Sequence, residues 1–189
     1  LYGIKCQEKF KAKMSKILSG NEFNEKYSNT KFYKVLSRDF IHNKFEYKNG
    51  LNIDVFPFNP IHECKAGGLY FTEFDKICLW LSYGIYIANI TIPNDASIYI
   101  EENKFKADKF ILDLDNKILI KECYGWDNND FCKLAVQQNG LALQFVKEQT
   151  EEICKIAVQL NGGALEFVKE QTEEICKIAV QETGYALQY

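Results

Sequence analysis

The segment FVKEQTEEIC runs from Phe145 to Cys154 and returns unchanged from Phe167 to Cys176. The adjoining CKIAVQ, residues 154–159, recurs at 176–181, and CKLAVQ at 132–137 is a close copy. Successive copies are 22 residues apart. A fixed period of this length is typical of repeat proteins, in which each unit packs against its neighbours.

Each repeat is predicted to contain two short helices. In the second repeat one apolar stripe follows helical spacing, at Ile153, Ile156, Ala157 and Leu160. Thr150 suits the helix N-cap, and Asn161-Gly162 suits the helix end. A second helix would carry Leu165 and Phe167-Val168 inward.

Two such helices cannot bury their apolar face alone, whereas stacked pairs can. The sequence therefore predicts an α+β chain in two domains. Residues 1–125 would form a small mixed sheet with one or two helices, and residues 126–189 an α-hairpin solenoid.

The run AVQQNGLALQFVKEQTEEIC, residues 135–154, resembles a family of short helical repeats of unknown function that is abundant in mimivirus-like giant viruses. The second repeat departs from this pattern with Gly163 in place of Leu141. The third has Glu182-Thr183 in place of Gln138-Asn139. The resemblance implies α-hairpin repeats and no known chemistry.

The N-terminal part shows strand signals, separated by one helical segment at Phe74–Tyr83 that ends at Gly84. Asn21–Thr30 is polar and is expected to be a loop, and Asp115-Asn116 predicts a tight hairpin. The predicted strands are Phe32–Leu36, Leu51–Val55, Leu69–Thr72, Ile85–Ile92, Ser97–Ile100, Phe110–Leu114 and Lys117–Lys121.

Four motifs of this part resemble the domain that precedes the repeats in many giant-virus proteins, including proteins that continue into ankyrin repeats. The motifs are GLNIDVFPFNP at 50–60, CKAGGLYFT at 64–72, IPNDA at 92–96 and FKADKFIL at 105–112. The resemblance implies an α/β head followed by a variable repeat array.

The composition argues against several classes of protein. The net charge is −3, and Arg38 is the single arginine among 23 basic residues, so nucleic-acid binding is not expected. No apolar run reaches the roughly 20 residues of a membrane helix, so no membrane partner is expected.

The seven cysteines are odd in number and include no CxxC pair, which favours free thiols in a reducing, intracellular setting, either the host cytoplasm or a virion. Cys132, Cys154 and Cys176 occupy one equivalent position of the repeat. They are interpreted as small buried apolar side chains rather than metal ligands. No cofactor or metal is predicted.

Candidate binding residues lie before and on the predicted strand at 69–72: His62, Cys64, Gly67, Gly68 and Tyr70. Gly67-Gly68 is either a ligand contact or a tight turn. His62 and Cys64, together with Cys78, are either metal ligands or ordinary side chains.

Two further features have alternative readings. Tyr70 followed by Glu101 distantly resembles ADP-ribosyltransferase-like folds, where an aromatic ring stacks on nicotinamide and a carboxylate orients a ribose hydroxyl. A buried tyrosine and a solvated Glu101-Glu102 pair are the alternative. Lys104, Lys106 and Lys109 are expected to form a solvated loop rather than a nucleic-acid patch.

The resulting hypothesis is a non-enzymatic adaptor that binds protein partners through its repeats. Two alternatives remain. The head could be a nucleotide- or ADP-ribose-acting transferase that the repeats target, or the chain could be a structural virion component.

Overall fold

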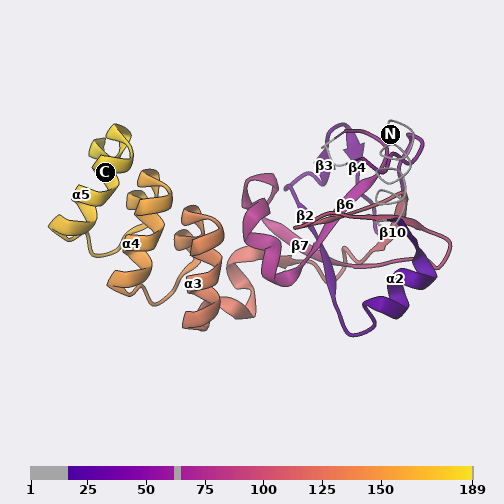
Figure 1. Ribbon diagram of the computed structural model, residues 1–189, viewed down its shortest axis with the longest axis horizontal. Coiled ribbons are helices and arrows are strands. Elements are labelled where there is room, and N and C mark those ends of the chain that lie inside the picture. Colours follow the sequence, from indigo (N-terminus) through magenta and orange to yellow (C-terminus); the bar gives the residue numbers. More distant parts are fainter. Residues whose placement is uncertain (1–16, 62–64, 189) are drawn as a thin grey trace, which may run out of the picture. The chain divides into compact units, whose positions relative to one another are not determined.

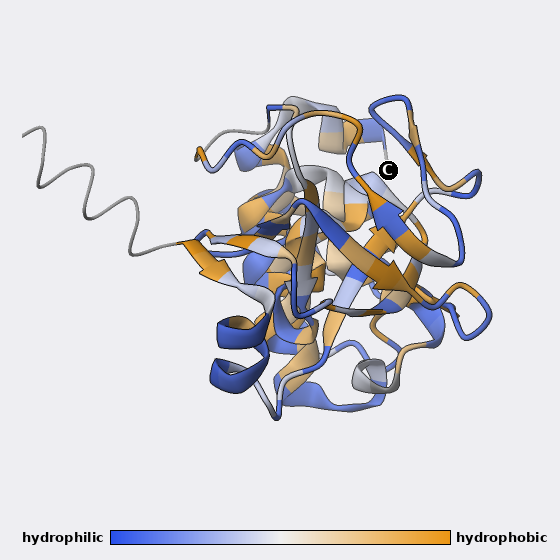
Figure 2. Ribbon diagram, turned by 90° about the vertical axis from the view of Figure 1, so that its right-hand side faces the viewer, coloured by the Kyte–Doolittle hydropathy of each residue, from blue (hydrophilic) through white to orange (hydrophobic). Residues whose placement is uncertain are grey.

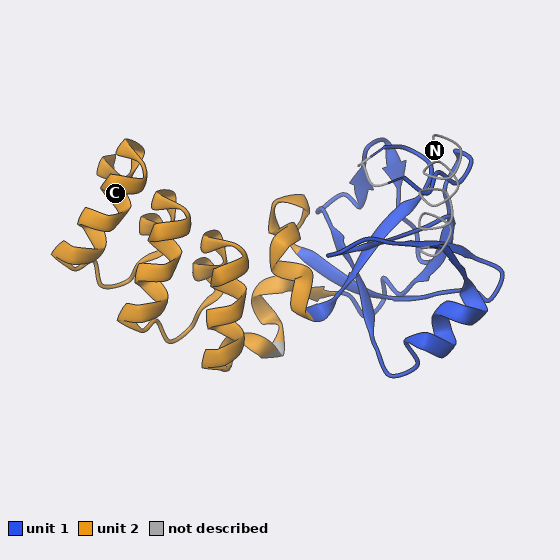
Figure 3. Ribbon diagram, in the orientation of Figure 1, with its two compact units in different colours: residues 1–74, 86–117 blue, residues 75–85, 118–189 orange. Residues whose placement is uncertain are grey.

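The computed structural model describes residues 17–61 and 65–188, which form two compact units (Figures 1 and 3). Unit 1 lies within residues 1–74 and 86–117, and unit 2 within 75–85 and 118–189. The domain boundary expected after residue 125 stays a prediction about the organisation of the chain.

Among its described residues, unit 1 contains one short α-helix, α2 (Gly20–Lys26), and ten strands. The strands are β1 (Ile17–Ser19), β2 (Phe32–Leu36), β3 (Ile41–His42), β4 (Phe45–Glu46), β5 (Gly50–Ile53), β6 (Leu69–Glu73), β7 (Tyr86–Thr91), β8 (Ser97–Ile100), β9 (Phe105–Ala107) and β10 (Lys109–Leu112). β3 and β4 form a separate two-stranded ribbon.

The large sheet has nine strands, eight of which follow the order β1-β8-β9-β6-β2-β7-β10-β5. The strand pairs along this path are antiparallel. The predicted small mixed sheet is therefore wrong in size and in strand direction. Single-sequence strand signals indicate that strands exist, but they do not reveal which strands pair or in which direction.

The predicted strands at residues 32–36 and 97–100 have the same bounds as β2 and β8. β1, β3, β4 and β9 were not predicted, because they are only two or three residues long. The hairpin expected at Asp115-Asn116 is wrong, because β10 pairs with β5 and β7 instead.

The segment expected to be a loop at residues 21–30 contains α2. Ser19 caps this helix: its Oγ accepts the Glu22 N–H at 3.3 Å, and the Glu22 carboxylate accepts the Ser19 N–H at 2.8 Å. This reciprocal capping box stabilises the helix in spite of its polar composition. Figure 2 shows most of α2 in the hydrophilic colour. The helix thereby places Phe23 in the core.

Phe23 is fully buried among aromatic rings from three strands. Its ring centre lies 4.9 Å from that of Phe32 and 5.3 Å from that of Phe105. Phe71 stacks on Phe105 at 5.3 Å. These rings bring β2, β6 and β9 together beneath α2, so the aromatic cluster is the main apolar contact of α2 with the sheet.

Unit 2 contains the repeats, and each repeat is an α-helix followed by a 3-10 helix. The α-helices are α3 (Asn129–Gln138), α4 (Glu151–Leu160) and α5 (Glu173–Glu182). The 3-10 helices are η4 (Gly140–Phe145), η5 (Gly162–Phe167) and η6 (Gly184–Gln188). No helix within residues 17–61 and 65–188 is both long and apolar enough to cross a bilayer.

The predicted α-hairpin solenoid is therefore a wrong description of the repeats. After Asn139 only the six residues 140–145 are helical, and Val146 is extended with φ −71° and ψ 117°. Two turns closed by i to i+3 bonds satisfy the backbone groups of so short a segment; the Val146 N–H, for example, donates to the Leu143 carbonyl at 3.1 Å. The segment has no room for a second α-helix.

Unit 2 also includes residues 75–85, which belong to the 3-10 helix η1 (Phe74–Tyr83), shown with the repeats in Figure 3. The side chains of Gln138 and Asn139 donate to the carbonyls of Asp75 at 2.8 Å and Cys78 at 3.1 Å. η1 therefore covers the first repeat.

The remaining short elements are β11 (Ile118–Leu119), η2 (Ile120–Glu122) and η3 (Tyr124–Asp127).

We expect Phe23→Ala to lower the free energy of unfolding by about 3–5 kcal/mol, because it leaves a ring-sized cavity in the core. Urea denaturation followed by circular dichroism measures this change. Glu25→Ala, on an exposed position of the same helix, is the control and should shift stability by less than about 0.5 kcal/mol. Equal effects of the two substitutions would contradict the role given to Phe23.

Candidate recognition surface

The backbones of neighbouring repeats approach each other at one glycine per repeat. A Cβ added at Gly140 would lie 2.5 Å from the Ala157 carbonyl oxygen, and one at Gly162 would lie 2.5 Å from that of Ala179. Real Cβ atoms do not come so close to an oxygen, so glycine permits this contact. The glycine of the Asn-Gly pair thus sets the spacing between repeats as well as following the helix end.

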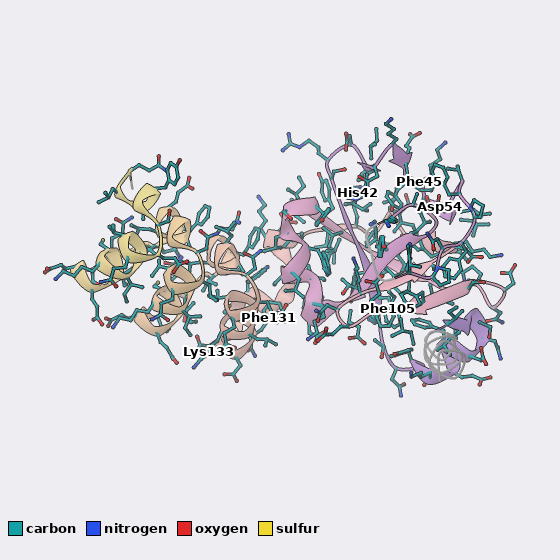
Figure 4. All side chains as sticks on the ribbon, turned by 45° about the horizontal axis from the view of Figure 1, so that its top comes forward. His42, Phe45, Asp54, Phe105, Phe131 and Lys133 are labelled. Carbon is teal, nitrogen blue, oxygen red and sulfur yellow. The ribbon has the colours of Figure 1, made fainter. Side chains whose placement is uncertain are left out.

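Two side-chain ladders link the repeats across this contact. The Gln149 amide donates to the Phe167 carbonyl at 2.9 Å and accepts the Lys169 N–H at 3.0 Å. Lys155 bridges Glu151 of its own helix at 2.9 Å and Glu174 of the next at 2.8 Å. Lys133 on α3, labelled in Figure 4, pairs with Glu152 in the same way. Residues shared by the repeats therefore maintain the stack.

The largest differences between the repeats fall at two positions on either side of the Asn-Gly junction. The first position, the last residue of each α-helix, is Gln138, Leu160 or Glu182, and the second is Leu141, Gly163 or Tyr185. We call these six residues the variable edge.

Leu160 is 53% exposed and Tyr185 is 82% exposed. Glycine, leucine and tyrosine are all compatible with the second position, so the fold does not dictate the residue there. The variable edge is a set of side chains that can change without disturbing the ladders, and it can present polar, apolar or aromatic groups to a partner.

Two of the three repeat cysteines, Cys132 and Cys154, lie inside the stack, whereas Cys176 of the third repeat is only half-buried, so the expected burial is wrong for Cys176. Cys132 is 2% exposed and Cys154 is 4% exposed, and the Cys132 thiol points to the Trp126 carbonyl at 3.4 Å. Two further buried cysteines lie outside the repeats, and burial raises the pKa of Cys78 to about 12 and that of Cys123 to about 11. Thiols with such pKa values are poor nucleophiles. Within the described residues, no group of three His, Cys, Asp or Glu side chains could hold a metal ion.

Of the predicted binding residues, His62 and Cys64 lie outside the described residues. Gly67 and Gly68 have φ values of 94° and 148°. A Cβ at Gly67 would lie 2.4 Å from the Pro57 carbonyl oxygen, and one at Gly68 would lie 2.5 Å from Cγ of Lys106. The glycine pair therefore lets the chain pack tightly against residues 57–59 and against Lys106.

Tyr70 lies between two lysines, with its ring centre 4.3 Å from the Lys104 ammonium and 5.2 Å from that of Lys106. Lys106 is fully buried, and it donates to the carbonyls of Asn59 at 2.9 Å and Lys65 at 3.1 Å. The solvated loop expected for the lysines is therefore wrong for Lys106. The signal that sequence reasoning missed is its place between Phe105 and Ala107 on a strand.

Glu101, the candidate ribose-orienting carboxylate, is buried at 7% exposure and pairs with Lys104 at 3.7 Å. The expected solvated Glu101-Glu102 pair is therefore wrong for Glu101, which lies under the surface, whereas Glu102 is exposed. A buried carboxylate that is paired with lysine suits a structural role.

Lys34 on β2 is a buried amine that sequence reasoning also missed. It is 8% exposed, and its ammonium lies 4.8 Å from the centre of the buried Tyr47 ring. Burial, and to a smaller extent the Lys104 charge, lowers the pKa of Lys34 to about 8. Burial and the Lys34 charge also lower the pKa of His42, which Figure 4 labels.

We expect Gly162→Ala to lower the free energy of unfolding by about 1–3 kcal/mol, because the added methyl group overlaps the Ala179 carbonyl. Gly184→Ala, at the equivalent position of the third repeat, is the matched control, since a Cβ there meets no atom within 4 Å. Chemical denaturation of both variants gives the comparison. A similar loss at both positions would show that helix propensity, not the contact, sets the effect.

We expect Lys34→Met to raise the free energy of unfolding at pH 7 by about 3–4 kcal/mol, since one pKa unit corresponds to about 1.4 kcal/mol. The pKa of Lys34 is about 8 in the folded chain and 10.5 in a free side chain. The unfolded chain thus binds more protons between these values, and wild-type stability rises with pH across that window.

The advantage of Lys34→Met should therefore be complete below pH 8 and vanish above pH 10.5. Urea denaturation at a series of pH values measures it. An advantage that is independent of pH would show that packing rather than charge burial destabilises the wild type.

The chain is similar to proteins of a giant virus. It is 34% identical over 80 residues to the putative ankyrin repeat protein R868 of Acanthamoeba polyphaga mimivirus, across 41% of this chain and 40% of that protein. It is 42% identical over 64 residues to the putative ankyrin repeat protein R229 of the same virus, across 33% and 21%. The chain thus spans less than half the length of these ankyrin repeat relatives.

No profile of a known protein family matches the chain, and no solved structure matches it significantly. The similarity to the mimivirus ankyrin repeat proteins confirms the expected likeness to giant-virus repeat proteins. The expected membership of a family of short helical repeats is not confirmed. The uncharacterized protein R869 of the same virus is 30% identical over 113 residues, which cover 57% of this chain and 81% of that protein. The chain therefore belongs to the same family of mimivirus proteins as R869.

Proposed function

We propose that the chain is a viral adaptor that recognises a protein partner through the variable edge of its repeats. The observation that carries the proposal is the contrast between shared ladder residues and changing exposed residues. Selection for stability alone would not require Leu160 to differ so much from Glu182, or Tyr185 from Gly163, at equivalent positions of the repeats. Stacked repeats use such exposed positions as extended binding surfaces.

The names of the relatives support this proposal. Two of them are described as ankyrin repeat proteins, and repeat proteins of that kind present side chains from successive units to a partner. The 22-residue period of this chain is shorter than the 33 residues of an ankyrin repeat. We place the adaptor inside the infected cell, where a reducing environment keeps buried thiols such as those of Cys132 and Cys154 free.

Binding by the variable edge would depend on its exposed apolar side chains. Leucine and tyrosine provide contact area at low entropic cost, and aromatic anchors dominate many interfaces. The surrounding charged side chains, such as those of Lys155 and Glu174, already form ion pairs with each other in the ladders. Specificity would therefore come from the pattern of side chains along the edge rather than from one charged group.

The test replaces variable residues by those of the first repeat, which the fold already tolerates. The double variant Leu160→Gln and Tyr185→Leu should lose at least about tenfold in affinity, or about 1.4 kcal/mol. Partners are first captured from an Acanthamoeba lysate with the wild-type chain. Purified partner is then titrated against both chains by isothermal calorimetry.

Gln159→Ala is the matched control, because Gln159 is exposed, adjoins Leu160 and is identical in the three repeats. It should leave the affinity unchanged. Loss of binding in this control with full binding by the double variant would contradict the proposal. Capture of the same partner by a chain without its repeats would contradict it as well.

A further inference from the structure

The third repeat has an apolar side that is open within the described part of the chain. Leu165 is 2% exposed in the second repeat, whereas the equivalent Leu187 is 76% exposed. Cys154 is 4% exposed, whereas the equivalent Cys176 is half-buried. These positions are buried where another repeat follows, and an array end that stays in water normally has a polar face. We call the surface of Cys176, Gly184 and Leu187 the end face.

Gly184 indicates what the end face is shaped to receive. At Gly140 and Gly162 an added Cβ would lie 2.5 Å from a carbonyl oxygen of the next repeat, whereas at Gly184 it would meet no atom within 4 Å. The backbone there does not require glycine either, because the φ of Gly184 is not positive. Glycine loses more conformational freedom on folding than any other residue. Its presence is therefore explained by a carbonyl that approaches from a further repeat.

The lysine beside the end face is the last member of a charge ladder. Lys155 pairs with Glu151 of its own helix at 2.9 Å and with Glu174 of the next helix at 2.8 Å. Within the described residues, the equivalent Lys177 pairs with Glu173 of its own helix at 2.6 Å. Its side chain is 68% exposed, compared with 28% for Lys155. A further repeat with a glutamate at the position of Glu174 would therefore continue the ladder.

The opposite side of the array is already covered, which restricts what can occupy the end face. Gln138 and Asn139 of the first repeat donate to backbone carbonyls of η1. Figure 1 shows η1 on the side of α3 that faces away from α4. The second and third repeats are each covered by the repeat before them. A second copy of this chain therefore has no open face that could follow α5, whereas an additional repeat has one.

We propose that the end face is the docking surface for one more repeat of the same 22-residue type, joined to the chain as the three repeats are joined to one another. Residues 146–150 connect η4 to α4, and the same linker placed after residue 189 would bring a further α-helix against α5. A carbonyl of that helix would fill the space beside Gly184, its glutamate would pair with Lys177, and its apolar residues would bury Leu187. Each contact repeats one that already joins neighbouring repeats.

An extended chain tests the docking, and the test involves no partner protein, so it is independent of the adaptor function. A copy of residues 168–189, with serine in place of its cysteine, is added after residue 189 of the full chain. The Cys176 thiol should then react with iodoacetamide at least about tenfold more slowly than in the wild type, because the added repeat covers it. Cys176→Ser, made in both chains, identifies the part of the reaction that belongs to this thiol.

Gly184→Ala tests the backbone contact itself. In the extended chain the added methyl group would overlap the approaching carbonyl, so the Cys176 reaction should become at least about fivefold faster again. In the wild type the same substitution should leave this reaction unchanged, because no atom lies within 4 Å of the added Cβ. A chain extended by a scrambled copy of residues 168–189 controls for added length, and its Cys176 should react as in the wild type.

Equal rates of the Cys176 reaction in the wild type and the extended chain would overturn the proposal, as would equal protection by the scrambled copy. An effect of Gly184→Ala that is the same in both chains would also contradict it. A Cys176 thiol that is already unreactive in the wild type would overturn it as well, because another surface would then cover the end face. Sedimentation velocity would show whether that surface belongs to a second copy.

Discussion

The close approach of each Asn-Gly junction to the next helix is the constraint on which the repeat unit depends. A carbonyl such as that of Ala157 occupies the space that a Cβ at Gly140 would need, so the distance between repeats is fixed by backbone rather than by adjustable side chains. Gln149 and Lys155 can then form the same ladders at each step. Regular spacing follows from one glycine per repeat, and exposed neighbours such as Leu160 and Tyr185 take no part in that contact.

Unit 1 is stabilised in a different way. The rings of Phe23, Phe32 and Phe105 fill the space between α2 and the sheet, and their burial stabilises an element that is itself mostly polar. The same interior contains Lys34, whose buried ammonium lies 4.8 Å from the centre of the Tyr47 ring. Burial of an amine opposes the gain from the aromatic core. Lys106 avoids most of this cost, because its ammonium donates hydrogen bonds to two backbone carbonyls.

Shared and variable residues of the repeats divide the work of folding and recognition. Shared residues such as Ala157 and Ile153 are buried and determine the packing. Variable residues such as Leu160 and Tyr185 are exposed and can respond to a partner. In the proposed adaptor, this separation would let one repeat framework serve different partners by changing two positions.

The sequence alone determined the 22-residue period, the α-helices that Thr150 and Thr172 cap, and strands such as β2 and β8, because caps and periodicity are local signals. It did not reveal the 3-10 form of the second segment in each repeat, the strand order or the burial of Lys34, Glu101 and Lys106. Those depend on which residues meet across the fold. A lysine or glutamate on a strand looks the same in sequence whether its neighbour is water or an aromatic ring, and only tertiary packing decides between them.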